Sequence, residues 1–237
     1  MSTEIKQGYS FSKEKHLHML DGKALTGTTT VLQVIAKPAL IPWAVKTCKD
    51  FLVAVLKSGA TITPELIEEA GKQHRLKKEK AGDWGTDLHA MIESYAKTGM
   101  ALSPKDEKME EAFNHFLSWT STNKVKFLDS EKNVYSPTMW VGGICDLVVE
   151  IDGKVWLADV KTGSGIYPEH FWQMASYQMC LQEMGLYPNV EGYIVLNLKK
   201  DGTFEEKRSI SNEENQSAFK AALTIYRIQE KLNKQVI

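Results

Sequence analysis

The chain has 237 residues, of which 43% are hydrophobic and 25% charged, and its formal net charge is −1. The composition is that of an ordinary globular protein. A net charge near zero does not by itself attract a polyanion, so contact with nucleic acid requires local basic patches. The three cysteines are too few for a disulfide framework, and no apolar run reaches the roughly 18–20 residues that span a bilayer. The polar N-terminus also lacks the apolar segment of a secretory signal, so we expect a cytoplasmic protein without a membrane partner.

The first third of the sequence favours helices. Apolar residues recur at helical spacing over 43–56, and Thr63-Pro64-Glu65 combines a capping threonine, a proline at the first position and an acid in the first turn. A further helix is expected over 85–96, while 1–25 shows only short alternations that fit a small strand or an irregular start. We therefore predict a mainly helical N-terminal lobe over residues 1–84.

The remainder of the chain alternates strand and helix patterns. The expected strands cover 133–135, 141–151, 155–160, 192–198 and 203–208, and the expected helices cover 168–184 and 213–232. The central strands are apolar on both faces, which is typical of a sheet covered by helices on each side. The fold class is therefore predicted as α/β, a central mixed β-sheet flanked by helices, in a single domain over 1–237 whose core spans 85–237.

One predicted hairpin concentrates charge. Asp152-Gly153 favours a two-residue type I′ turn, in which Ile151 faces Lys154 and, further out, Asp146 faces Asp159. Lys161 follows Asp159 by two residues and points the same way. Directly opposed carboxylates destabilise a strand pair unless a proton or a cation separates them, and a divalent metal is the simplest solution. The alternative is a surface hairpin with an Asp159–Lys161 salt bridge and an incidental Asp146.

This group of two acids and a lysine has a definite chemical use. Carboxylate oxygens suit Mg²⁺ or Mn²⁺, which polarise a phosphodiester and lower the pKa of a bound water. Lys161 would orient that water and stabilise the negative charge that develops on the phosphate. The residues alone therefore favour metal-assisted phosphodiester hydrolysis.

The order of the motifs resembles a known group. The segments 143–146 (GICD), 159–162 (DVKT) and 173–177 (QMASY) are similar to the signature of PD-(D/E)XK nucleases, in particular the RecB-type exonuclease branch with a QxxxY motif. The upstream segment 85–89 (GTDLH) also resembles that branch, which has a restriction-endonuclease-like core. Cys145 stands at the position of the name-giving proline, and the iron-sulfur cysteines of some relatives are absent. The segment 28–43 resembles a helical lobe of phage versions of these nucleases, which suggests a phage origin and, in that case, the host cytoplasm as location.

The resemblance implies a role for each matching residue. It assigns the metal to His89, Asp146, Asp159 and the backbone carbonyl of Val160, with Glu131 near the site, and it assigns the catalytic group to Asp146, Asp159, Lys161, Gln173 and Tyr177. Gln173 and Tyr177 lie four apart on one helical face and would position the lysine or contact the DNA backbone. Taken singly, a helical histidine is more often a satisfied side chain than a ligand, and a Gln/Tyr pair is more often a helix contact.

A basic run precedes this site. Arg75, Lys77, Lys78 and Lys80 have only Glu79 among them as an opposing charge and would contact the phosphate backbone of DNA. A solvated helix face explains such a run equally well.

These observations predict a metal-dependent DNA exonuclease that uses Mg²⁺ or Mn²⁺, with two ions, and hydrolyses phosphodiester bonds through a metal-activated water. Its expected partners are linear single- or double-stranded DNA and recombination, repair or replication proteins. Two alternatives stay open: a structure-specific endonuclease for flap or branched DNA, and a catalytically silent DNA-binding recombination accessory. The site residues do not separate the first alternative from an exonuclease, whereas the presence of His89, Asp146, Asp159 and Lys161 together argues against the second.

Overall fold

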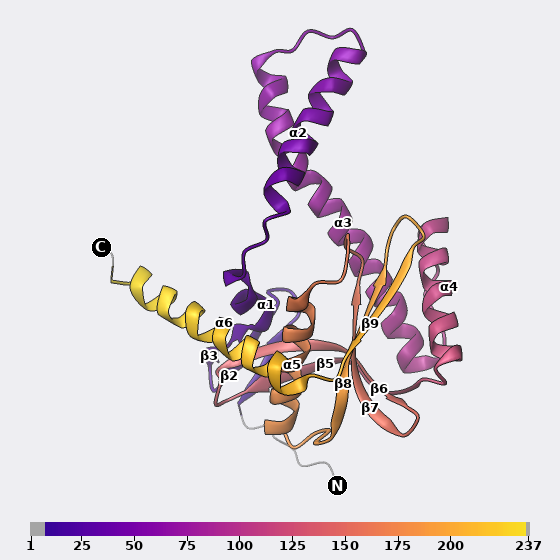
Figure 1. Ribbon diagram of the computed structural model, residues 1–237, viewed down its shortest axis with the longest axis vertical. Coiled ribbons are helices and arrows are strands. Elements are labelled where there is room, and N and C mark those ends of the chain that lie inside the picture. Colours follow the sequence, from indigo (N-terminus) through magenta and orange to yellow (C-terminus); the bar gives the residue numbers. More distant parts are fainter. Residues whose placement is uncertain (1–7, 236–237) are drawn as a thin grey trace. The chain divides into compact units, whose positions relative to one another are not determined.

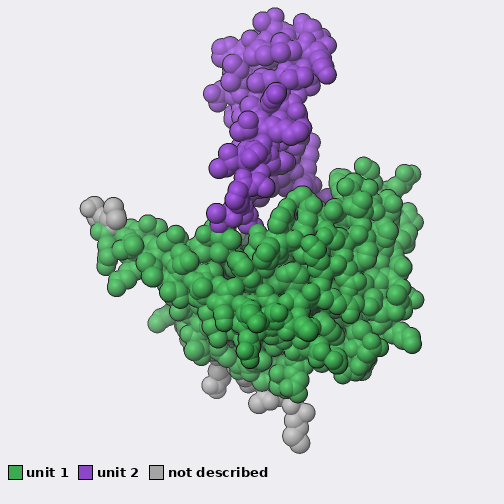
Figure 2. Space-filling view, viewed as in Figure 1, with its two compact units in different colours: residues 1–35, 88–237 green, residues 36–87 purple. Residues whose placement is uncertain are grey.

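The computed structural model describes residues 8–235, so positions 1–7 and 236–237 of the predicted ranges lie outside it. The chain divides into two compact units, one of residues 1–35 and 88–237 and one of residues 36–87 (Figure 2). The predicted division into a lobe over 1–84 and a core over 85–237 stays a prediction.

The larger unit is built on a six-stranded mixed sheet (Figure 1). Its strands are β4 (Thr26–Gly27), β5 (Lys126–Ser136), β6 (Val141–Ile151), β7 (Lys154–Lys161), β8 (Val190–Leu198) and β9 (Phe204–Ser209). The order is β4-β6-β7-β8-β9, and β5 lies along the other edge of β6. Because β4 and β7 share one edge of β6, residues 143–146 between their contacts have no strand partner on that edge within residues 8–235.

The connections follow from the turn chemistry and the helix between strands. Asp152 and Gly153 have φ angles of 50° and 75°, which is the left-handed pair that a type I′ turn requires, so β6 and β7 form the predicted hairpin. The chain then passes through α5 (Pro168–Glu183) to β8, which runs parallel to β7. β8 and β9 form a second antiparallel hairpin.

Helices cover both faces of this sheet. Tyr193 of β8 hydrogen-bonds to Gln178 of α5, whereas Phe127 of β5 contacts Tyr95 of α3 (Pro64–Thr98) and Phe116 of α4 (Glu107–Thr122) through their rings. Strand pairing places Phe127 beside Val149, and Val149 beside Trp156. These residues alternate along their strands with those that face α5, so they lie on the opposite face of the sheet. The predicted α/β class with a mixed sheet between helices is confirmed. Helix α6 (Asn212–Asn233) packs against α5 and closes the core on that side.

The N-terminal end of the larger unit forms a small three-stranded sheet. Strands β1 (Tyr9–Ser12), β2 (Leu17–Leu20) and β3 (Lys23–Ala24) pair in sequence order, and β4 is followed by α1 (Thr28–Val31) and the 3-10 turn η1 (Leu32–Val34). Buried Leu20, Leu25 and Tyr135 join this sheet to the main one.

The unit of residues 36–87 consists of α2 (Leu40–Lys57) and the first part of α3. An edge-to-face contact between Trp43 and His74 joins the two helices. The two helices predicted from Thr63 and over 85–96 prove to be one continuous helix of 35 residues, because its interior glycines do not interrupt it.

Helix α4 was not predicted, although its signals are present. Asp106 accepts a hydrogen bond from the backbone N–H of Met109 at 2.7 Å, which caps the helix, and the buried positions follow helical spacing. Within residues 8–235, no helix combines the length and the apolar character that crossing a membrane requires.

Candidate metal centre

The site forms where β6 and β7 separate. The predicted register holds for the five pairs from Ile151/Lys154 to Leu147/Ala158, but the ladder ends there and the direct pairing predicted for Asp146 and Asp159 is wrong. The reason is local: the backbone N–H of Val160 donates to Oδ2 of Asp146 at 2.9 Å instead of continuing the strand pairing.

Glu131 approaches Asp146 through an unusual backbone conformation. The β5–β6 pairs Ser130/Leu147 and Lys132/Cys145 flank the two acids, and Glu131 has a φ of 51°. A non-glycine residue in the left-handed region is uncommon in a strand and is frequent at functional sites.

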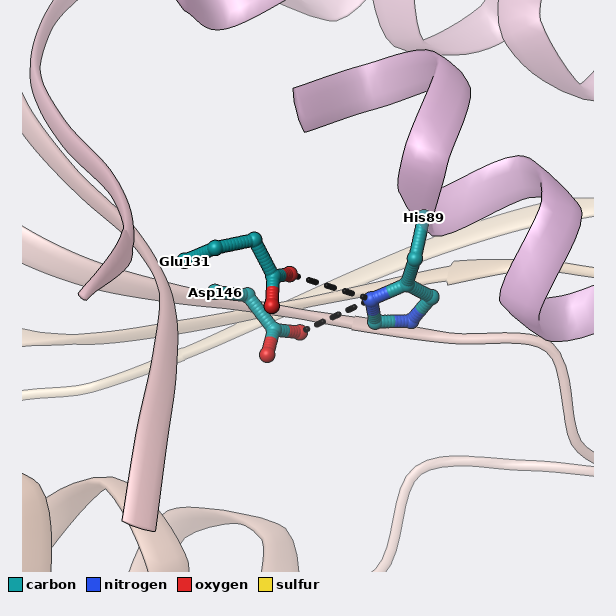
Figure 3. A group of neighbouring side chains, drawn as sticks. All are labelled: His89, Glu131 and Asp146. Carbon is teal, nitrogen blue, oxygen red and sulfur yellow. Dashed lines mark ion pairs between the residues drawn. The ribbon is translucent and has the colours of Figure 1, made fainter. Parts of the chain in front are cut away.

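His89, from the last part of α3, reaches both carboxylates (Figure 3). Its Nδ1 lies 3.6 Å from Oδ2 of Asp146 and 3.8 Å from Oε1 of Glu131. One ligand atom from each of these three residues lies within 4.8 Å of the others, as a bound cation requires. The Nε2 of His89 lies 3.0 Å from the carbonyl oxygen of Val160, which orients the ring.

Asp159 and Lys161 form an ion pair on β7 in which Asp159 is buried and Lys161 is partly buried. The Asp159 side chain is only 1% exposed, and the Lys161 ammonium donates to its Oδ1 at 2.8 Å and lies 2.6 Å from its Oδ2. Oδ2 accepts no hydrogen bond of normal geometry from any residue in the described part of the chain. Asp159 is not one of the three clustered ligands, and the Lys161 ammonium lies against both of its oxygens.

Helix α5 supplies the other predicted pair. Gln173 donates its side-chain N–H to the hydroxyl of Tyr177 at 2.8 Å, and Tyr177 is buried; their predicted contact with the lysine or with DNA stays a prediction. Tyr177 approaches β6 at Gly143, where a Cβ would lie 2.4 Å from a Tyr177 ring carbon. The sequence analysis missed this function of Gly143, which the Gly142-Gly143 pair inside a strand indicates, since glycine in a strand often marks close approach of another group.

Electrostatics at the site reflect three carboxylates facing two basic groups. Burial lowers the pKa of His89, but the carboxylates of Asp146 and Glu131 outweigh it and raise this pKa to about 9. Burial raises the pKa of Asp159, although Lys161 opposes the effect. Burial lowers the pKa of Lys161, and the carboxylates of Asp159 and Asp146 more than compensate, so its pKa rises and the ammonium stays protonated.

The donor set fits a hard divalent cation. Oxygen ligands from carboxylates, joined by one imidazole nitrogen, suit Mg²⁺ or Mn²⁺, and Oδ2 of Asp159 is a buried acceptor without a hydrogen bond. The Val160 carbonyl oxygen can only accept, so Nε2 of His89 is the donor in their hydrogen bond. This tautomer leaves Nδ1 as the ligand atom.

The basic run lies apart from these residues in the sequence and belongs to the other unit. Arg75, Lys77, Lys78 and Lys80 are exposed on α3 within residues 36–87, and Arg75 lies 3.9 Å from Glu79. Glu93, one turn after His89, pairs with Lys97.

The sequence matches no protein-family model and no curated protein. Among solved structures, the chain is similar to LHK-Exo in complex with dAMP, with a TM-score of 0.38 and 14% identity over 62% of this chain and 80% of that one. It is also similar to the alkaline exonuclease LHK-Exo from Laribacter hongkongensis, with a TM-score of 0.32 and 15% identity over 64% and 86% of the respective chains. The fold and the site thus describe an α/β protein with a candidate metal centre, and similarity at this level does not define its family.

Proposed function

We propose that this protein is a metal-dependent nuclease that hydrolyses the phosphodiester bonds of DNA. One observation carries the proposal: the clustered ligand atoms of His89, Glu131 and Asp146 lie beside the Asp159–Lys161 pair. A cation-binding cluster next to a buried lysine is the combination that phosphodiester hydrolysis needs.

Each residue has a distinct task in this proposal. His89, Glu131, Asp146 and Asp159 would hold Mg²⁺ or Mn²⁺, which supplies a water of lowered pKa and neutralises charge on the phosphate. The carbonyl of Val160 accepts from Nε2 of His89 and would hold the ring with Nδ1 toward the cation. Lys161 would orient the attacking water and stabilise negative charge on the phosphate oxygens. Tyr177, held by Gln173, would fix the wall of the site at Gly143.

The finer parts of the proposal rest on the order of the motifs. They are an exonuclease of the RecB-type branch, two bound ions, linear DNA as substrate, a cytoplasmic location and a part in phage recombination or repair. Arg75, Lys77, Lys78 and Lys80 would contact the DNA backbone.

The test compares DNA substrates, metals and variants. Linear and closed circular DNA, each single- and double-stranded, are incubated with the protein in Mg²⁺, Mn²⁺ or EDTA. We expect cleavage only with metal, and a fall of about 10²-fold or more for Asp146→Asn and for Lys161→Ala. Degradation of linear but not circular DNA would support an exonuclease, whereas cutting of circles would favour the endonuclease alternative.

Glu150→Gln is the matched control, because Glu150 is a carboxylate on the same strand that pairs with Lys126 outside the site. It should cleave like the wild type. Cleavage in EDTA, or full activity of both Asp146→Asn and Lys161→Ala, would overturn the proposal.

A further inference from the structure

Asn197 lies beside the catalytic lysine on the neighbouring strand. β7 and β8 run parallel, and their register pairs Lys161 with Asn197, as it pairs Asp159 with Val195. Paired residues of adjacent strands project from the same face, and residues two apart on a strand share that face. Asn197 therefore belongs to the face that carries Asp159 and Lys161.

The amide of Asn197 is buried without a partner. Its side chain is fully inaccessible, and neither Oδ1 nor Nδ2 forms a hydrogen bond with any residue between 8 and 235. Nearly all buried polar groups in proteins are paired, because an unpaired one loses its hydration without compensation. A leucine of similar size would avoid this loss, so stability alone does not account for asparagine at this position.

The contact of Lys161 with Asp159 suggests a use for the Asn197 amide. Its ammonium now lies against both oxygens of Asp159, at 2.8 and 2.6 Å. A cation at Asp159 needs those oxygens and repels the ammonium, so Lys161 must release at least one of them when the site is loaded. A partly buried ammonium that loses its acceptor is destabilising unless another acceptor is close.

We propose that Asn197 is the positioning residue that receives Lys161: its Oδ1 accepts the lysine N–H when Asp159 turns to the cation. This inference rests on the proposed function and adds a residue to its site. The amide carries no charge, so it holds the ammonium without competing for the cation. The Asn197 amide is thus unpaired while Lys161 contacts Asp159, and it accepts the Lys161 N–H once a cation is bound at Asp159.

Asn197→Leu tests the inference through thermal unfolding as well as activity. In EDTA this variant should unfold about 2–4 °C higher than the wild type, because it removes the unpaired amide. Its rise in unfolding temperature on adding Mg²⁺ should be smaller than that of the wild type, because Lys161 then lacks an acceptor. The kcat for DNA cleavage should fall about 10- to 100-fold with KM little changed.

Two further variants separate this role from packing. In a Lys161→Ala background, Asn197→Leu should no longer reduce the rise in unfolding temperature on adding Mg²⁺, since no ammonium is left to donate to position 197. Asn197→Asp keeps an acceptor and should keep at least the wild-type rise. If Asn197→Leu unfolds at a lower temperature in EDTA, or shows the full wild-type rise with Mg²⁺, the inference is overturned. A wild-type protein that binds Mg²⁺ but leaves DNA intact would instead contradict the proposed function.

Discussion

At the scale of single residues, His89 makes the metal-free site sensitive to pH. The carboxylates of Asp146 and Glu131 raise its pKa from 6.5 to about 9, so the folded protein keeps a proton that the unfolded chain releases at lower pH. The stabilisation from this proton is fully present below pH 6.5 and is lost as the pH rises through 9. Since a ligand imidazole must be neutral, cation binding has to displace the same proton.

This linkage gives a prediction for His89→Gln in EDTA. Between pH 6 and pH 9 the wild type should lose about 1–3 kcal/mol more unfolding free energy than the variant, since one pKa unit corresponds to about 1.4 kcal/mol. Urea unfolding at both pH values measures the difference. Glutamine can still donate to the Val160 carbonyl, so the comparison isolates the titration. Parallel losses in the two proteins would show that His89 does not hold the extra proton.

The site residues differ in how far the sequence could predict them. The ion pair of Asp159 and Lys161 followed from the sequence, because strands alternate with a period of two. The turn at Asp152-Gly153 fixed the register only as far as Leu147/Ala158. The contact of Glu131 with His89 accompanies a left-handed backbone at Glu131, and a glutamate in the sequence does not predict that conformation. Nothing in the sequence marked Asn197, because its importance depends on parallel pairing of β7 with β8.

At the scale of elements, the contact of β6 with α5 depends on one missing side chain. Gly143→Ala would place a Cβ 2.4 Å from the Tyr177 ring, so the buried ring, the strand or the helix must shift. We expect a loss of about 1–3 kcal/mol in unfolding free energy, measured by urea denaturation, together with reduced cleavage. Gly163→Ala is the control, because a Cβ there meets nothing within 4 Å, and it should stay within about 0.5 kcal/mol.

A second variant shows where the strain arises. In a Tyr177→Leu background, the cost of Gly143→Ala should shrink, since the ring that collides is gone. An undiminished cost would mean that the strand itself, and not the helix contact, requires glycine.

The elements were predictable where a local signal was strong. The hairpin of β6 and β7 followed from a turn dipeptide between apolar strands, and α5 from Pro168 at its first turn. Helix α4 was missed, although Asp106 caps it and its buried residues recur at helical spacing. The sequence predicted two helices where the structure has the single helix α3. A helix tolerates an interior glycine at a cost of about 1 kcal/mol, so the glycines of α3 do not end it.

At the scale of the whole molecule, the basic run belongs to a unit different from that of the site residues. Replacing Lys77, Lys78 and Lys80 together by alanine tests whether this unit binds DNA. If each lysine neutralises one phosphate, the slope of log K against log salt should become less negative by about 0.9 per lysine for duplex DNA. Fluorescence anisotropy in Ca²⁺ or EDTA over a salt series measures it without cleavage.

The matched control is the triple replacement of Lys220, Lys231 and Lys234, which removes the same charge at the end of the chain. It should leave the salt slope within error of the wild type. Equal slopes for all three proteins would identify the basic run as a solvated helix face.

The bond between the Val160 amide and the Asp146 carboxylate gives the site its own spectroscopic probe. Most strand amides report on backbone pairing, but this one reports on a side chain that we propose as a metal ligand. Its chemical shift and its hydrogen-exchange rate therefore respond directly to a cation bound at Asp146. A single backbone resonance can thus follow loading of the centre, even in variants that no longer cut DNA.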